Sequence, residues 1–228
     1  MTTHLNDFTV PDRTPSSDTL SRNARSFSLY KSVFKRVLDI TLVILAVPFA
    51  LPLVLLMALL VARDGSSPFF LQRRVGRNGE IFNLVKIRTM VKDAEAKLES
   101  YLEANPEARA EWDSTQKLKD DVRITGVGKF LRKSSLDELP QLWNVLRGDM
   151  SLVGPRPMME DQKPLYPGSA YYALRPGITG LWQISDRNQS TFAARAEFDA
   201  DYFNSLSLKT DMSILARTVS VVLRCTGY

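Results

Sequence analysis

The sequence predicts a mostly helical α+β protein, in which an N-terminal re-entrant membrane helix precedes a small cytoplasmic domain with a β-hairpin and interfacial helices. Two features lead to this prediction: a long uncharged apolar run near the N-terminus, and two short apolar segments separated by Asn78-Gly79. The first has the length of a membrane segment, and the second is typical of a hairpin. The expected boundaries are a disordered tail at 1–29, the membrane helix at 30–64 and a globular domain at 65–228.

The first 29 residues are rich in Ser and Thr, contain Pro11 and Pro15, and show no apolar periodicity. Such a composition cannot bury enough apolar surface to fold, which favours a disordered tail. The segment also lacks the apolar core of a secretory signal peptide.

The run from Ile40 to Ala62 has 23 residues and no charge. About 20 apolar residues cross the hydrocarbon core of a bilayer, so this run is a candidate membrane segment. The alternative is a buried core helix. It is the weaker alternative because soluble helices of ordinary length rarely lack a polar face.

Two features favour a re-entrant helix over a simple span. Pro48 and Pro52 lie in the middle of the run, where each removes a backbone donor and favours a kink or break. Basic residues, which prefer the cytoplasmic side, flank both ends of the run. They are Lys31, Lys35 and Arg36 before it, and Arg63, Arg73, Arg74 and Arg77 after it. A helix that enters, bends and returns keeps both groups and both termini in the cytoplasm, whereas the alternative, a proline-kinked bitopic helix, does not.

The following segments are predicted to be two strands, Phe69–Val75 and Glu80–Ile87, joined by a hairpin turn at Gly76-Arg77-Asn78-Gly79. A phosphate-cradling loop is the alternative for these glycines, but no Walker Lys-Ser/Thr follows. Residues 90–117 are predicted to form a charged helix, interrupted near Asn105-Pro106.

The composition restricts the chemistry. The 30 Lys and Arg residues exceed the 25 Asp and Glu residues, and the net charge of +5 suits an anionic partner such as nucleic acid, acidic lipid or a nucleotide sugar. The single Cys225 excludes an intrachain disulfide. Because His4 is the only histidine, Ser-His and Cys-His catalysis and histidine-ligated metals are nearly excluded. Carboxylates, Lys, Arg and hydroxyl groups remain.

The most informative segment contains the adjacent carboxylates Asp137 and Glu138. Helical spacing of apolar residues begins at Leu136, and Arg147-Gly148 is a stop signal. Ser135 is a good N-cap, so the two carboxylates are expected at a helix N-terminus. There, Ser135 and Glu138 form a capping-box pattern, which is the structural interpretation.

The same carboxylates permit a catalytic interpretation. One could attack phosphorus while its neighbour helps to hold a divalent cation such as Mg²⁺, which commonly uses one or two carboxylates plus substrate phosphates. The prolines of Pro155-Arg156-Pro157 fix the backbone around an arginine that suits phosphate binding, although a stiffened turn with a solvated Arg156 is the alternative. The turn-rich segment at 174–183 adds Arg175 as a further substrate-binding candidate.

Six motifs occur in order, and together they are more specific than any one of them. They are K-R-x-x-D before the apolar run, Q-R-R-x-G, K-x-R-T-M, L-R-K-S-S-L-D-E-L-P-Q-L-W-N, S-L-V-G-P-R-P and R-P-G-I-T-G-L-W-Q. From about Phe34 to the C-terminus the chain resembles the bacterial sugar transferases, which are monotopic polyprenyl-phosphate phosphoglycosyl transferases. It is similar to the small exopolysaccharide-initiating members of the ExoY galactose-1-phosphate transferase type.

The resemblance implies a role for each matching residue, and a catalytic phosphoglycosyl transferase domain at 65–228. Asp137 matches the nucleophile, and Glu138 matches its partner in the dyad. Arg132 matches a phosphate-binding arginine, and Arg156, between Pro155 and Pro157, matches the nucleotide-sugar turn. Pro52 matches the helix break, although relatives often have Ser-Pro where this chain has Leu51-Pro52. Charged residues match those that the family holds at the headgroup level, namely Lys35, Arg36 and Asp39.

The implied reaction transfers a sugar-1-phosphate, galactose-1-phosphate before glucose-1-phosphate, from a UDP-sugar to undecaprenyl phosphate with release of UMP. Mg²⁺ is the implied cofactor, held by Asp137 and Glu138. The implied location is the bacterial inner membrane. Membrane lipid, a homodimer and downstream glycosyltransferases are the further expected partners, and no nucleic acid is expected. The rival functions are a membrane-anchored scaffold, a nucleic-acid-binding protein, which leaves 40–62 unexplained, and a metal phosphatase, which needs more clustered metal ligands.

Overall fold

The computed structural model describes residues 29–115, 118–185 and 192–223, so the predicted disordered tail lies outside the described residues apart from Leu29. The helices are α2 (Lys35–Val61), α3 (Ala94–Ala104), α4 (Pro106–Thr115), α5 (Gly126–Ser134), α6 (Gln141–Arg147), α7 (Leu181–Ile184), α8 (Arg195–Asn204) and α9 (Leu208–Leu223). The strands are β1 (Phe69–Val75), β2 (Ile81–Ile87), β3 (Ser151–Val153) and β4 (Gly177–Thr179). The described residues are therefore mostly helical, as predicted.

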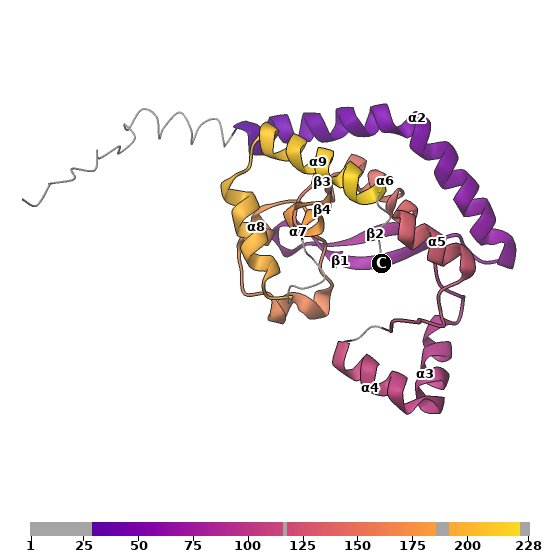
Figure 1. Ribbon diagram of the computed structural model, residues 1–228. Coiled ribbons are helices and arrows are strands. Elements are labelled where there is room, and N and C mark those ends of the chain that lie inside the picture. Colours follow the sequence, from indigo (N-terminus) through magenta and orange to yellow (C-terminus); the bar gives the residue numbers. More distant parts are fainter. Residues whose placement is uncertain (1–28, 116–117, 186–191, 224–228) are drawn as a thin grey trace, which may run out of the picture.

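Helix α2 is long and apolar enough to cross a membrane, and only 22% of its most apolar stretch is buried. Many of its large apolar side chains are exposed to solvent, and Phe49 is 78% exposed. This exposure argues against a buried core helix. Pro48 and Pro52 lie inside α2 without ending it. Figure 1 shows the consequence: the helix stays continuous but bends, and arches over the rest of the chain.

The start of α2 is fixed to the C-terminal helices by Asp211, which is 1% exposed on α9. Its carboxylate accepts hydrogen bonds from Lys35 at 2.7 Å and from Tyr30 and Tyr202 at 2.6 Å each. One turn further along α2, Asp39 accepts the backbone N–H of Leu152 at 3.0 Å. The charged residues at the start of the apolar run therefore hold it against the globular part.

Strands β1 and β2 form the predicted antiparallel hairpin, with Phe69 opposite Ile87 and Val75 opposite Ile81. β2 begins one residue later than predicted. The turn uses two left-handed residues, Asn78 (φ 58°) and Gly79 (φ 82°), as expected for Asn-Gly.

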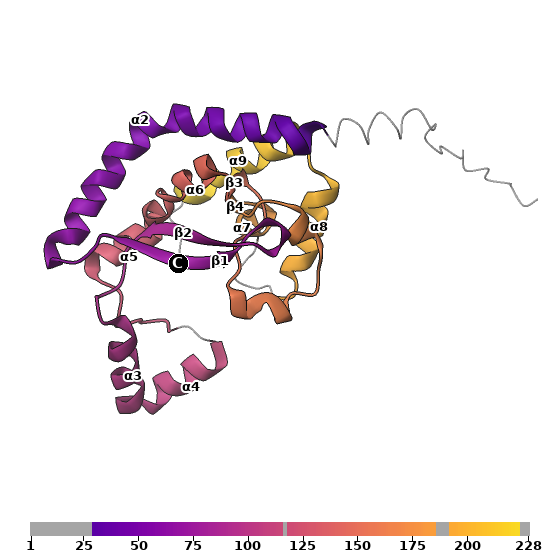
Figure 2. The ribbon, with the colours of Figure 1, turned by 180° about the vertical axis from the view of Figure 1, so that it is seen from behind.

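The predicted charged helix at 90–117 forms two helices, α3 and α4, with the expected interruption at Asn105-Pro106, but the first of them begins only at Ala94. They project from the side opposite α2 in Figures 1 and 2.

Strands β3 and β4 form a short parallel pair, with Val153 opposite Thr179. This pairing was not predicted, because the segment at 174–183 was expected to form turns. Glycines make it possible: a Cβ on Gly177 would lie 2.1 Å from the backbone N of Gly154, and one on Gly180 would lie 2.1 Å from the Gly154 carbonyl oxygen. The pair therefore places the Pro155-Arg156-Pro157 turn, which follows β3, beside the start of α7, which follows β4.

Helix α6 is joined to the hairpin through Asn144, which is fully buried. Its side-chain oxygen accepts the N–H of Val85 at 3.0 Å, and its Nδ2 donates to the Asn83 carbonyl at 2.8 Å and to Asp149 at 3.0 Å. The predicted helix stop at Arg147-Gly148 is confirmed by the left-handed Gly148 (φ 96°). The segment that precedes α6 is thereby positioned against β2.

Candidate active site

The carboxylates Asp137 and Glu138 lie in a tight 3₁₀ turn, η4 (Leu136–Glu138), between α5 and α6. The predicted capping box is wrong. Ser135 is left-handed (φ 57°), ends α5, and makes no side-chain cap bond, while the Glu138 N–H donates to its backbone oxygen at 3.3 Å. Because a left-handed residue turns the chain sharply, the next α-helix begins only at Gln141. The turn presents the carboxylates on a short loop clamped between two helices.

Two adjoining cavities meet at this turn, and Asp137, Glu138, Arg132 and Arg156 line both. One, here called the basic cavity, has a volume of about 190 Å³ and is also lined by Arg74, Lys86 and Pro157. The other, here called the leucine-lined cavity, has a volume of about 260 Å³. It is also lined by Leu136, Leu139, Leu142, Ile178, Ile184 and Gln183.

Burial makes Asp137 an unusual carboxylate. It is 9% exposed, and burial, reinforced by the charge of Glu138, raises its pKa to about 6. Lys86 and Arg132 counteract this rise. At neutral pH the group is therefore mostly ionised and poorly solvated, which is the state required of a carboxylate nucleophile.

Lys86 is a site residue for which the sequence analysis assigned no role. Burial, together with the nearby charges of Arg74 and Arg132, lowers its pKa to about 8, while Asp137 and Glu138 oppose the change. The signal that could have found it is strand periodicity. Phe82 and Leu84 are buried on β2, so the next alternate residue, Lys86, belongs to the same inward face. Lysine is seldom buried in a protein unless it is paired, so an inward lysine on this strand is a candidate for a functional residue.

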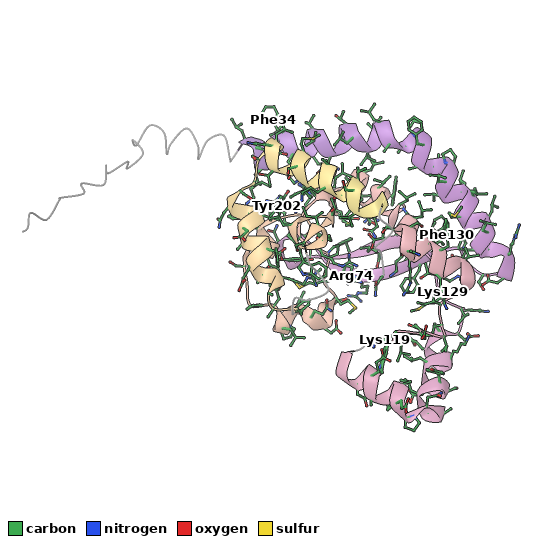
Figure 3. All side chains as sticks on the ribbon, viewed as in Figure 1. Phe34, Arg74, Lys119, Lys129, Phe130 and Tyr202 are labelled. Carbon is green, nitrogen blue, oxygen red and sulfur yellow. The ribbon has the colours of Figure 1, made fainter. Side chains whose placement is uncertain are left out.

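The arginines that line the basic cavity are held by backbone and hydroxyl groups as well as by carboxylates. Arg132 donates from Nε to the Thr89 hydroxyl at 2.8 Å, and Arg74 donates from Nη1 to the Pro157 carbonyl at 3.1 Å. The buried Nε of Arg74 has no partner among the described residues. Figure 3 shows Arg74 near the middle of the molecule. These donors are oriented before any ligand binds.

The Pro155-Arg156-Pro157 turn brings Arg156 to the dyad, with Nη2 3.8 Å from Glu138 Oε1. A second arginine that the sequence analysis missed supports this turn: Arg195 on α8 donates to the Arg156 carbonyl at 2.9 Å. Its guanidinium also lies 4.8 Å from the Trp182 ring centroid. The turn therefore contacts Glu138 through the Arg156 side chain and Arg195 through the Arg156 backbone carbonyl.

The structure does not bring Arg175 to the carboxylates. Its Nε donates to the Gly148 carbonyl at 2.9 Å, and it lines neither cavity. Gly148 instead lines a third cavity, of about 450 Å³, together with Arg77 and Arg147. The carboxylates that line it are Glu80 and Asp149, and Asp149 lies 3.2 Å from Arg147 and is therefore paired. This cavity holds no free carboxylate pair, and the two smaller ones are the better candidate site.

Comparison with known proteins identifies the family of this chain. A family model described as "Bacterial sugar transferase" matches residues 30–225. The chain belongs to the bacterial sugar transferase family. The match includes α2, both cavities and every predicted site residue of this family member.

The relatives in the family have informative names. The UDP-galactose-lipid carrier transferase of Erwinia amylovora is 50% identical over 169 residues, which cover 73% of this chain and 35% of the relative. Exopolysaccharide production protein ExoY of Sinorhizobium fredii is 48% identical over 166 residues, or 72% of this chain and 74% of that protein. The undecaprenyl-phosphate galactose phosphotransferase of Salmonella typhimurium is 49% identical over 169 residues, or 73% and 36%. The chain thus spans about a third of two relatives and about three quarters of ExoY.

The carboxylate pair Asp137 and Glu138 fits a divalent cation that completes its coordination shell with substrate oxygens. No group of three or more His, Cys, Asp or Glu residues gathers within 29–115, 118–185 and 192–223. An all-protein metal cage is therefore not formed by the described residues. Mg²⁺, however, needs only one or two carboxylates when phosphate oxygens and water complete its shell. Asp137 and Glu138, adjacent and open to both cavities, provide that donor set.

Proposed function

We propose that this protein transfers a sugar-1-phosphate from a UDP-sugar to undecaprenyl phosphate and releases UMP, as the first membrane step of exopolysaccharide synthesis. The observation that carries the proposal is the poorly solvated Asp137, adjacent to Glu138 and surrounded by Lys86, Arg132 and Arg156. Two anionic groups among several cations suit a substrate that is itself a polyanion. The names of the relatives support this reaction, and galactose is the favoured sugar because several relatives are named for it.

The reaction has two balanced steps. A carboxylate oxygen of Asp137 attacks the β-phosphorus, the bond from that phosphorus to the bridging oxygen breaks, and UMP leaves with the bond electrons. The enzyme then carries the sugar phosphate as an acyl phosphate on Asp137. An oxygen of the lipid phosphate attacks the same phosphorus, the bond to Asp137 breaks, and the carboxylate is regenerated. The product is a polyprenyl diphosphate sugar.

The surrounding cations do the electrostatic work of both steps. Lys86 and Arg132 face Asp137 and stabilise the charge that develops on the phosphoryl oxygens, while Arg156 binds the diphosphate from the Glu138 side. Glu138 and Asp137 would hold Mg²⁺, which would supply further charge neutralisation when bound. The burial that raises the pKa of Asp137 also limits the access of water, which would otherwise hydrolyse the acyl phosphate.

The acceptor explains the membrane helix. We propose that α2 is re-entrant in the bacterial inner membrane, with both termini in the cytoplasm, because one substrate lies in the bilayer and the other in the cytosol. Support comes from its exposed apolar face, its bend and its basic flanks. A homodimer and contacts with downstream glycosyltransferases remain part of the proposal.

The decisive test replaces Asp137 by asparagine. We expect Asp137→Asn to fold and to insert into membranes but to lose essentially all turnover, since an amide does not attack phosphorus. Wild-type protein, given labelled UDP-galactose and Mg²⁺ without a lipid acceptor, should release UMP and retain label covalently, and the variant should do neither. The exposed Asp161→Asn is the matched control. Substantial activity in Asp137→Asn, as a scaffold would predict, or label on another residue, contradicts the covalent mechanism.

A further inference from the structure

Gln183 is a buried amide without a hydrogen-bond partner. It lies on α7, is 7% exposed, and lines the leucine-lined cavity together with Asp137 and Glu138. Neither Nε2 nor Oε1 has a partner among the residues that the structure describes. A buried polar group left unpaired destabilises a fold, and such groups in native proteins call for an explanation.

The unpaired amide is held firmly in place. A Cβ on Gly180, one helical turn earlier, would lie 3.0 Å from Gln183 Oε1, so the side chain packs against glycine backbone. The other polar side chains at this end of the cavity have partners: the Thr179 and Thr218 hydroxyls are 2.7 Å apart, and Thr218 also donates to the Ile214 carbonyl at 2.8 Å. Gln183 alone among these three presents unused donors and an acceptor.

The chemistry of the amide narrows the ligand. A prenyl chain would satisfy neither atom, and a phosphate would leave Oε1 unpaired because it offers only acceptors. A hexose offers hydroxyl groups that both donate and accept, and its C–H face packs on apolar side chains such as Ile178 and Ile184. The basic cavity already provides the cations for the phosphates.

The reaction geometry selects the hexose over the uracil, whose imide edge also has a donor and an acceptor. In an in-line attack the leaving nucleotide lies opposite the attacking Asp137, whereas the sugar oxygen stays on the same phosphorus beside it. Asp137 and Glu138 line the leucine-lined cavity, so a group that stays on the phosphorus bonded to Asp137 lies within reach of it.

We propose that the leucine-lined cavity receives the hexose of the nucleotide sugar and that the side-chain amide of Gln183 hydrogen-bonds its hydroxyl groups. This inference rests on the proposed function and names the sugar subsite of that reaction. Gln183 is then a specificity residue, because a site built to hydrogen-bond a hydroxyl discriminates against a sugar that lacks it or presents it differently.

The test compares Gln183→Leu with wild-type protein in the UMP-release step, using UDP-galactose, UDP-glucose and UDP-hexoses that each lack one hydroxyl. We expect kcat/KM of Gln183→Leu to fall at least tenfold with the better of the two sugars, and the ratio between the sugars to shrink toward one. With one of the deoxy sugars, kcat/KM of the wild-type protein should be at least tenfold lower than with the parent sugar. In Gln183→Leu, the same deoxy sugar should cause no such further decrease. Gln162→Leu is the control for the loss of a glutamine amide outside both cavities, and it also removes the hydrogen bond from the Met159 N–H to Gln162 at 2.9 Å.

Two further readouts separate recognition from a structural role. Because the substitution removes an unpaired buried amide, the thermal midpoint of Gln183→Leu should equal or exceed that of wild type. Inhibition by UMP should be unchanged. Unaltered sugar discrimination, weaker UMP inhibition, or a lowered midpoint with equal losses for both sugars would each overturn the proposal. If the variant does not fold, the deoxy series on wild type decides, and no loss with any deoxy sugar overturns it. Wild-type turnover and its loss in Asp137→Asn report separately on the proposed function.

Discussion

At the scale of single residues, several polar groups that line the two cavities lack the contacts or the solvation that such groups usually have. Asp137 is a carboxylate under 10% exposed, Gln183 has an unpaired amide, and Arg74 has an unpaired Nε. Ser135, which ends the preceding helix, has a positive φ that is uncommon outside glycine. Strained and unsatisfied groups of this kind cluster at active sites, where ligands complete their contacts.

The pKa shifts predict a bell-shaped pH profile. Asp137 must be ionised to attack, and its raised pKa of about 6 means that kcat/KM falls as the pH drops below about 6. Lys86 must be protonated, and its lowered pKa of about 8 means that kcat/KM falls above about pH 8. Initial rates of UMP release at subsaturating UDP-galactose between pH 5 and 9.5 check both limbs. Lys86→Gln should lower the rate and remove the alkaline limb, and a persisting alkaline limb in this variant would assign it to another group.

These residue-scale features set the limit of what the sequence could predict. The dyad, Arg132 and the Pro155-Arg156-Pro157 turn were identified as candidates because motifs at fixed spacing are visible in a sequence, and the structure brings them together. Arg175 was also a candidate, but it lies elsewhere. Arg195 could not be predicted from the sequence, because it lies 39 residues after Arg156 and reaches the Arg156 carbonyl only through the position of α8.

At the scale of elements, local signals predicted local structure. The Asn-Gly turn, the strands of the hairpin and the break at Asn105-Pro106 depend on neighbouring residues and are confirmed. The parallel β3–β4 pair depends on glycines more than 20 residues apart, whose close approach has no local signature. The capping-box prediction was wrong for a related reason. The pattern Ser135-x-x-Glu138 is present, but Ser135 is already the C-cap of the preceding helix α5.

The contact between α6 and the hairpin predicts a measurable loss of stability. Asn144→Ala leaves the Val85 N–H and the Asn83 carbonyl without their side-chain partner and opens a void. We expect the free energy of unfolding to drop by about 2–4 kcal/mol, and kcat/KM to drop with it because the η4 turn loses its support. Denaturant titration in detergent measures the first. Asn105→Ala, which removes only a bond to the Tyr101 carbonyl in the α3–α4 arm, should change stability by less than about 1 kcal/mol; equal losses in both variants would contradict the assigned role of Asn144.

At the scale of the whole molecule, the position of α2 predicts the topology. Basic residues flank both ends of the apolar run, so both termini should be cytoplasmic. In a Cys225→Ser background, single cysteines introduced at Ser16 and at Ser114 should both resist an impermeant thiol reagent in intact cells and react after lysis. Labelling at Ser16 alone would establish a bitopic span and exclude the re-entrant arrangement.

Helix α2 is tied to the globular part at both of its ends. Lys35 and Asp39 hold its first turns, and at the other end Arg88 pairs with Asp64 at 2.7 Å and donates to the Val61 carbonyl at 3.3 Å. The next residue after Arg88 is Thr89, which holds Arg132 beside the dyad. In the proposed membrane position, the helix and the reacting carboxylate therefore move as one body. Hydrophobic mismatch would then change the height of Asp137 relative to the plane of lipid phosphates, so bilayer thickness sets how closely the acceptor approaches it.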